Sequence, residues 1–80
     1  MLASVSFIYM REYITNEVNT LRLAKGITQE DFAAAVGVSR QTVIAIEKGN
    51  YTPSVLLALK IAKFFRKSLE EVFIIKYSPR

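Results

Sequence analysis

The residues between positions 40 and 48 carry side chains of the kinds that read DNA bases. Successive residues of a helix turn by about 100°, which places Arg40, Gln41, Ile44 and Ala45 on one helix face. In a major groove, arginine offers forked donors to guanine, glutamine makes paired contacts with adenine, and small apolar side chains touch thymine methyl groups. The same face is also typical of an ordinary solvated helix, so the pattern leaves both interpretations open.

A second set of polar residues is placed to hold DNA phosphates. Gln29 stands at the start of a predicted helix, where unpaired backbone amides and the helix dipole favour an anion. The other candidates lie within the next helix or just beyond its ends: Ser39, Thr42, Lys48, Asn50 and Tyr51. Helix-start and turn positions favour such residues for structural reasons as well, which is the alternative for each of them.

Capping and turn residues define a pair of short helices around these side chains. Thr28 is the expected N-cap of one helix and Ser39 that of the next, and Gly37 supplies the left-handed turn between them. The first helix has an inward apolar stripe at helical spacing, formed by Phe32, Ala33 and Val36. Val43 and Ile46 of the second helix are expected to face the same core.

Three further helices are predicted around that pair. One precedes it over residues 16–25. Another follows Pro53, which is expected at or near its first turn, and its wide core face consists of Val55, Leu57, Ala58, Ile61, Ala62 and Phe65. A short last helix starts with a full capping box at Ser68 and is expected to bury Leu69 and Val72.

Both ends of the chain have a strand-like composition. Residues 73–77 read as a strand, and residues 7–15 are also rich in β-branched and aromatic side chains. A small antiparallel pairing between the two segments is one expectation, and two unpaired tails are the alternative. Met10 is an alternative start to Met1, because residues 1–9 add nothing that the helical domain requires.

Composition bounds the class of protein. Eighty residues, 51% of them hydrophobic, predict one small globular domain. The absence of cysteine and histidine excludes disulfides, thiolate or imidazole metal sites and histidine acid–base chemistry. The sequence also lacks a glycine-rich phosphate loop and a converging pair of carboxylates. It therefore predicts a protein that is not an enzyme and that uses no metal, no cofactor and no small-molecule substrate.

The net charge of +4 is unevenly distributed. Charges balance over residues 1–59, and the excess comes from basic residues between Lys60 and Arg80. A basic surface favours a nucleic-acid partner, although a solvated surface is the commoner cause of such an excess. No apolar run approaches the roughly 20 residues that span a bilayer, and no basic segment of a secretion signal is present. We therefore expect a cytoplasmic protein without a membrane partner.

Taken together, these residues resemble the Cro and phage-repressor (Xre-type) family of helix-turn-helix transcriptional regulators. The resemblance covers about residues 14–73. The features that carry it are spread along that range: Leu21-Arg22, Lys25-Gly26-Ile27-Thr28-Gln29, Ala33, Gly37-Val38-Ser39, Thr42-Val43, Ile46-Glu47, Gly49, Pro53-Ser54 and Leu69-Glu70-Glu71-Val72-Phe73. As a set they are specific to the family.

The resemblance implies an all-α, five-helix, lambda-repressor-like DNA-binding domain at residues 14–73, with an extension at 1–13 and a tail at 74–80. It implies that Gln29 and the loop after the third helix hold phosphates of double-stranded DNA, while the residues named first face bases. It also implies a partly buried ion pair between Arg22 and Glu47 that ties the first helix to the third.

The chain departs from the family pattern on its fourth helix. Leu56 and Phe64 replace residues that are more often polar or small, and Arg66-Lys67 replaces a usual glycine–apolar pair. Extra apolar residues need a cover, and regulators of this kind bind palindromic sites as two-fold dimers. We therefore expect a homodimer interface formed by Leu56, Phe64, Phe73, Ile75 and Tyr77. A somewhat wider core is the alternative for Leu56 and Phe64.

The function predicted from the sequence is sequence-specific DNA binding by a transcriptional repressor that occupies a palindromic operator. Two alternatives stay open. One is the antitoxin of a toxin–antitoxin pair that represses its own operon, and the other is a protein-interaction module that has lost DNA binding. The polar residues at positions 29, 40 and 41 speak against the second alternative.

Overall fold

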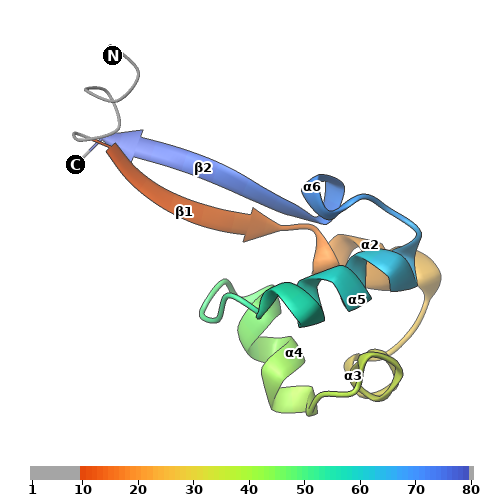
Figure 1. The fold of residues 1–80 in the computed structure, drawn as a ribbon. Coiled ribbons are helices and arrows are strands. Elements are labelled where there is room, and N and C mark those ends of the chain that lie inside the picture. Colours follow the sequence, from red (N-terminus) through yellow and green to blue (C-terminus); the bar gives the residue numbers. More distant parts are fainter. Residues whose placement is uncertain (1–9, 80) are drawn as a thin grey trace.

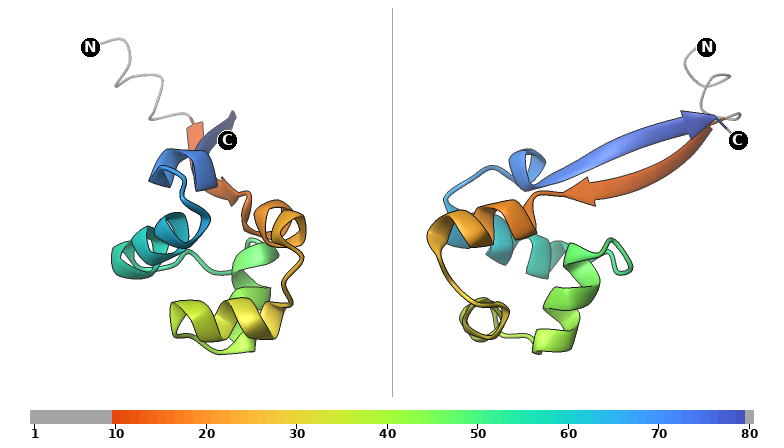
Figure 2. Two further views of the ribbon diagram at one scale, coloured as in Figure 1. Left: turned by 90° about the vertical axis from the view of Figure 1, so that its right-hand side faces the viewer. Right: turned by 180° about the vertical axis from the view of Figure 1, so that it is seen from behind.

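The computed structural model describes residues 10–79, which form a small helical body with a two-stranded ribbon projecting from it (Figures 1 and 2). The elements follow in the order β1 (Met10–Asn16), α2 (Val18–Lys25), α3 (Gln29–Val36), α4 (Arg40–Glu47), α5 (Val55–Phe65), α6 (Leu69–Val72) and β2 (Phe73–Pro79). The described chain thus contains the five predicted helices, and the fold class is confirmed. No helix within residues 10–79 is long and apolar enough to cross a membrane.

The two ends of the described chain pair with each other. β1 and β2 form an antiparallel sheet in which Ile14 lies opposite Ile75 and Asn16 opposite Phe73. The predicted pairing of the two tails is therefore confirmed. Residues 7–9 of the predicted N-terminal segment lie outside the described part of the chain. At its base the ribbon is tied to the helical body by a hydrogen bond from the Asn16 side-chain amide to the Ile46 carbonyl, 2.9 Å long.

Caps set the helix boundaries. The hydroxyl groups of Thr28, Ser39 and Ser68 each accept a hydrogen bond from a backbone amide three residues later, and the Ser68 capping box is complete. The first helix was predicted to begin at residue 16, but it begins at Val18. The reason is that Asn16 ends β1, and its side-chain oxygen accepts a hydrogen bond from the Val18 amide.

The fourth predicted helix, α5, differs from expectation in one way. Its N-cap is Ser54, whose hydroxyl accepts a hydrogen bond from the Leu57 amide, so Pro53 lies directly before the helix and near its first turn, as predicted. Val55 was expected on the core face, yet its side chain is 73% exposed. The buried residues of α5 are Leu57, Ala58, Ile61, Ala62 and Phe65, so its core face begins at Leu57.

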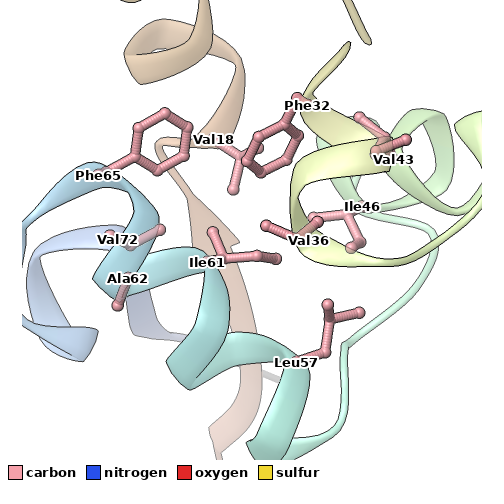
Figure 3. Packing of buried hydrophobic residues seen from close by; sticks show 11 residues of the cluster. Val18, Phe32, Val36, Val43, Ile46, Leu57, Ile61, Ala62, Phe65 and Val72 are labelled. Atoms are coloured by element: carbon pink, nitrogen blue, oxygen red, sulfur yellow. The ribbon is translucent and has the colours of Figure 1, made fainter. Parts of the chain in front are cut away.

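The core lies where α2, α3, α4, α5 and α6 meet, and each of these helices contributes to it (Figure 3). Phe32 of α3 stacks on Phe65 of α5, with ring centroids 5.2 Å apart, and meets the edge of Phe64 at 5.3 Å. Phe64 and Phe73 are partly buried and pack against this cluster. For Phe64 the structure therefore favours the wider-core alternative, whereas Leu56 is 70% exposed.

Arg66 ends α5 in the left-handed conformation, with φ at 56°, and no other non-glycine residue in residues 10–79 has a positive φ. The resembled family uses glycine at this helix end. Here an arginine adopts the same left-handed conformation, at a steric cost.

We expect Arg66→Gly to raise the free energy of unfolding by about 0.5–1 kcal/mol, measured by urea denaturation. Lys67→Gly is the control. Because Lys67 has no positive φ, glycine relieves no strain there, and the added backbone freedom should only lower the free energy of unfolding. Equal losses in both variants would contradict the strain argument.

Candidate nucleic-acid interface

The helix-turn-helix is formed by α3 and α4, which the Gly37 turn joins. Gly37 has a φ of 78° and its amide donates to carbonyl groups in the last turn of α3, so α3 ends there and α4 begins three residues later, at Arg40. Val43 and Ile46 of α4 are fully buried against the core. These two side chains fix the rotation of α4 about its own axis. The opposite face of the helix must therefore point away from the body.

The four predicted base-contacting residues all lie on that outward side of α4. Arg40 and Gln41 are exposed in its first turn, and Ile44 and Ala45, one turn further, are half-buried. Long polar donors at the helix start and small apolar groups behind them match the groups that a major groove presents. The arrangement presents these side chains to a partner without any change in the core.

Apart from Gln29, which is described below, the predicted phosphate contacts divide into two groups. Lys48, Asn50 and Tyr51 are exposed in the turn after α4, which is closed by Gly49 at a φ of 78°. Ser39 and Thr42 use their hydroxyl groups locally: the two oxygens are 3.1 Å apart, and Ser39 also caps α4. The first group thus follows the C-terminal end of α4, and the second lies at its N-terminal end.

Glu47 is held by three side chains. Arg22 donates to both of its carboxylate oxygens, from Nε at 2.7 Å and from Nη2 at 3.2 Å, so the ion pair expected from the resemblance is present and bidentate. Asn19 and Gln29 donate to Oε1 at 3.0 and 3.1 Å. The Arg22 side chain is 9% exposed and that of Glu47 is 6% exposed. This network fixes α4 to α2 and to the start of α3.

Gln29 therefore has a structural contact that the sequence did not predict. An amide nitrogen carries two hydrogen atoms, so the bond to Glu47 leaves the second one able to reach a phosphate. Asn19 was also missed, since it lies 28 residues from Glu47 and no local pattern links them. Lys60 was missed for the same reason: its Nζ lies 3.3 Å from the place that a Cβ at Gly37 would occupy, which brings a positive charge beside the turn.

The Glu47 network makes stability depend on pH. Burial opposes the charged form of Glu47, but the hydrogen bonds from Arg22, Asn19 and Gln29 and the charge of Arg22 outweigh it, so its pKa is lowered. In an unfolded chain the pKa of a glutamate is about 4.3. The stabilisation is therefore complete above that pH and is lost as the pH falls through the lower folded value.

We expect the free energy of unfolding to fall with acidification below about pH 4, and Glu47→Gln to remove part of that slope. Urea denaturation of both proteins across this range checks the prediction. Glu30→Gln serves as the control, because Glu30 is exposed at the start of α3. An unchanged slope in Glu47→Gln would contradict the role given to the network.

Comparison with known proteins places this geometry in a family. Residues 18–72 match the family described as helix-turn-helix, so the match spans α2 to α6. A protein of Methanocaldococcus jannaschii, named an uncharacterised helix-turn-helix-type transcriptional regulator, is 56% identical over 59 residues, which cover 74% of this chain and 89% of that protein. The transcriptional repressor RstR of the cryptic phage CTXphi of Vibrio cholerae is 31% identical over 72% of this chain and 52% of its own length.

Among solved structures, the restriction-modification controller protein C.AhdI of Aeromonas hydrophila superposes with a TM-score of 0.64. It is 33% identical, and the alignment covers 69% of this chain and 83% of that one. The sequence match and the similarity of fold lead to the same assignment. The chain belongs to the helix-turn-helix family of DNA-binding transcriptional regulators, of the Cro and phage-repressor (Xre) type.

Proposed function

We propose that this protein represses transcription by occupying a palindromic operator as a homodimer, with α4 of each protomer in the major groove. The observation that carries the proposal is the orientation of α4. Val43 and Ile46 bury one side of the helix and the Glu47 network locks its end, so Arg40 and Gln41 are held outward in a fixed position. The repressor among the relatives supports the direction of regulation.

In this proposal the outward-facing residues of α4 have separate roles. Arg40 and Gln41 donate to base edges, and Ile44 and Ala45 contact thymine methyl groups. The phosphates on either side are held by polar groups at the helix starts and in the following turn: Gln29, Ser39, Thr42, Lys48, Asn50 and Tyr51. Phosphate contacts position the protein on the duplex, and the base contacts select the sequence.

The size of the molecule supports the proposed dimer. The two shorter dimensions of the described chain are 23 and 22 Å, and the long one, 45 Å, includes the ribbon. Half-sites that present the same face of DNA are about 34 Å apart, so a single helical body reaches one of them. Two copies related by a two-fold axis place two α4 helices on one face of the duplex.

Selection of bound duplexes from a random pool tests the proposal. The wild-type protein should enrich a palindromic motif, while Arg40→Ala and Gln41→Ala should each relax the preference at different positions of it. A pool without any enriched motif would overturn sequence-specific binding, and motifs unchanged in both variants would overturn the base contacts. No feature of residues 10–79 favours the antitoxin or the interaction module over this function.

A further inference from the structure

A lysine of α5 lies against the turn of the helix-turn-helix. The Nζ atom of Lys60 is 3.3 Å from the place that a Cβ at Gly37 would occupy, so the missing side chain at Gly37 leaves room for the ammonium group over the turn. Because the turn leads directly into α4, α5 places a positive charge beside the start of the helix that carries the predicted base contacts.

The ammonium group has a physical reason to stay at this place. The carbonyl groups in the last turn of a helix carry partial negative charge, which favours a cation beside them. The last turn of α3 contains no basic residue of its own, so Lys60 supplies the cation from another helix. In residues 10–79 the only ion pair is that between Arg22 and Glu47, so no carboxylate neutralises the charge of Lys60.

Lys60 also lines a hollow of about 280 Å³ beside the turn. Gly37 and Val38 form part of its wall, and Tyr51 and Ser54 line it together with Lys60. Gly37 precedes α4 in the chain, whereas Tyr51 follows it. The loop after α4 therefore returns to the side of the helix on which the turn lies, and the hollow joins residues that the sequence separates.

The polar groups of the hollow suit an anion. Lys60 has three N–H donors, and the hydroxyl groups of Tyr51 and Ser54 can each donate one hydrogen bond. Ser54 keeps its hydrogen for this purpose, because its oxygen caps α5 by accepting from the Leu57 amide. None of the lining residues, all of which belong to the described chain, is acidic. A phosphate of the DNA backbone, with one negative charge and several acceptor oxygens, matches this set of donors.

The proposed docking of α4 leaves a phosphate strand near this hollow. α4 has eight residues and is about 12 Å long, about the width of a major groove, so its two ends approach different phosphate strands. The exposed cation Lys48 follows the C-terminal end. At the N-terminal end the predicted phosphate contacts are the hydroxyl groups of Ser39 and Thr42, which bond to each other at 3.1 Å. Lys60 provides the cation that is missing from that end.

We infer that the hollow beside the Gly37 turn binds a DNA phosphate, with Lys60 as its cation and Tyr51 and Ser54 as further donors. The inference rests on the proposed function and deepens it. It adds two phosphate contacts that the sequence did not predict, Lys60 and Ser54, and it places Tyr51 on a different phosphate from Lys48. Lys60 is a positioning residue in this arrangement and selects no base sequence.

Removing the charge of Lys60 tests the inference. Lys60→Gln should weaken binding about fivefold, on the selected operator and on other duplexes alike, and should reduce the slope of log affinity against log salt concentration by about one for each bound protomer. Lys60→Arg keeps the charge and should keep the slope. Lys67→Gln is the matched control, because it removes an exposed charge beyond the end of α5 and outside the hollow, so the slope should stay unchanged.

Fluorescence anisotropy over a salt series gives these slopes, and thermal denaturation of the same variants separates binding from folding. A purely structural role for Lys60 at the end of α3 would lower the unfolding midpoint in Lys60→Gln and leave the slope at the wild-type value. That result, or equal slopes in Lys60→Gln and Lys67→Gln, would overturn the inference.

Operators with single neutral phosphates locate the contact. When one phosphate at a time is replaced by an uncharged methylphosphonate, the wild type should lose affinity at each phosphate that it holds. One of these losses should vanish in Lys60→Gln, and a different one in Lys48→Ala. If no loss depends on Lys60, or if both lysines depend on the same phosphate, the inference is wrong and the proposed function stands. If the wild type binds no duplex, the proposed function fails and the inference fails with it.

Discussion

Replacing Arg22 by alanine is expected to lower the free energy of unfolding by about 3–5 kcal/mol, because it leaves a buried carboxylate without its cation. The Glu47 side chain is 6% exposed and receives two hydrogen bonds from Arg22. The variant also removes the bond from Arg22 Nη1 to the Ile27 carbonyl, 2.9 Å long. A domain of this size has little stability to spare, so the Tm should fall by more than about 10 °C.

Two companion variants make this result specific. Arg40→Ala removes an exposed arginine and should change stability by less than about 0.5 kcal/mol. In the double variant Arg22→Ala/Glu47→Gln, a neutral amide replaces the stranded carboxylate and can still accept from Asn19 and Gln29, so part of the loss should be recovered. Thermal and urea denaturation measure all three. A wild-type midpoint in Arg22→Ala would contradict the argument.

The second large effect is expected on DNA binding. On the selected operator, Arg40→Ala should cost about 1–3 kcal/mol, which is a loss of affinity between roughly fivefold and 150-fold, and should relax specificity at the base pair that it reads. Since Arg40 is exposed and is not part of the buried core, the unfolding midpoint should stay unchanged. Fluorescence anisotropy with the operator and with single-base variants of it gives both quantities.

Lys48→Ala is the contrasting variant, because Lys48 lies after α4 and is assigned to a phosphate. It should weaken binding about equally on all duplexes and reduce the slope of log affinity against log salt concentration by about one. If Arg40→Ala behaves in the same way, Arg40 holds a phosphate rather than a base. The salt series therefore distinguishes positioning contacts from reading contacts.

The sequence by itself determined the local parts of this protein. Thr28, Ser39 and Ser68 cap helices where their side-chain chemistry requires it, Gly37 makes the left-handed turn, and Val43 and Ile46 face inward as their spacing predicts. These features depend on residues within one helical turn of each other. The family resemblance then supplied the ion pair between Arg22 and Glu47.

Only the tertiary structure decided contacts between distant segments. Asn19 and Gln29 join the Glu47 network, Asn16 ties the ribbon to α4, and Lys60 approaches the Gly37 turn, although none of these pairs is close in sequence. Val55 and Phe64 show the same limit, since their apolar character fits either a core or an exposed surface. Which of the two each residue joins depends on how α5 packs on its neighbours. That packing leaves Val55 on the surface beside the ribbon and turns Phe64 toward Phe32.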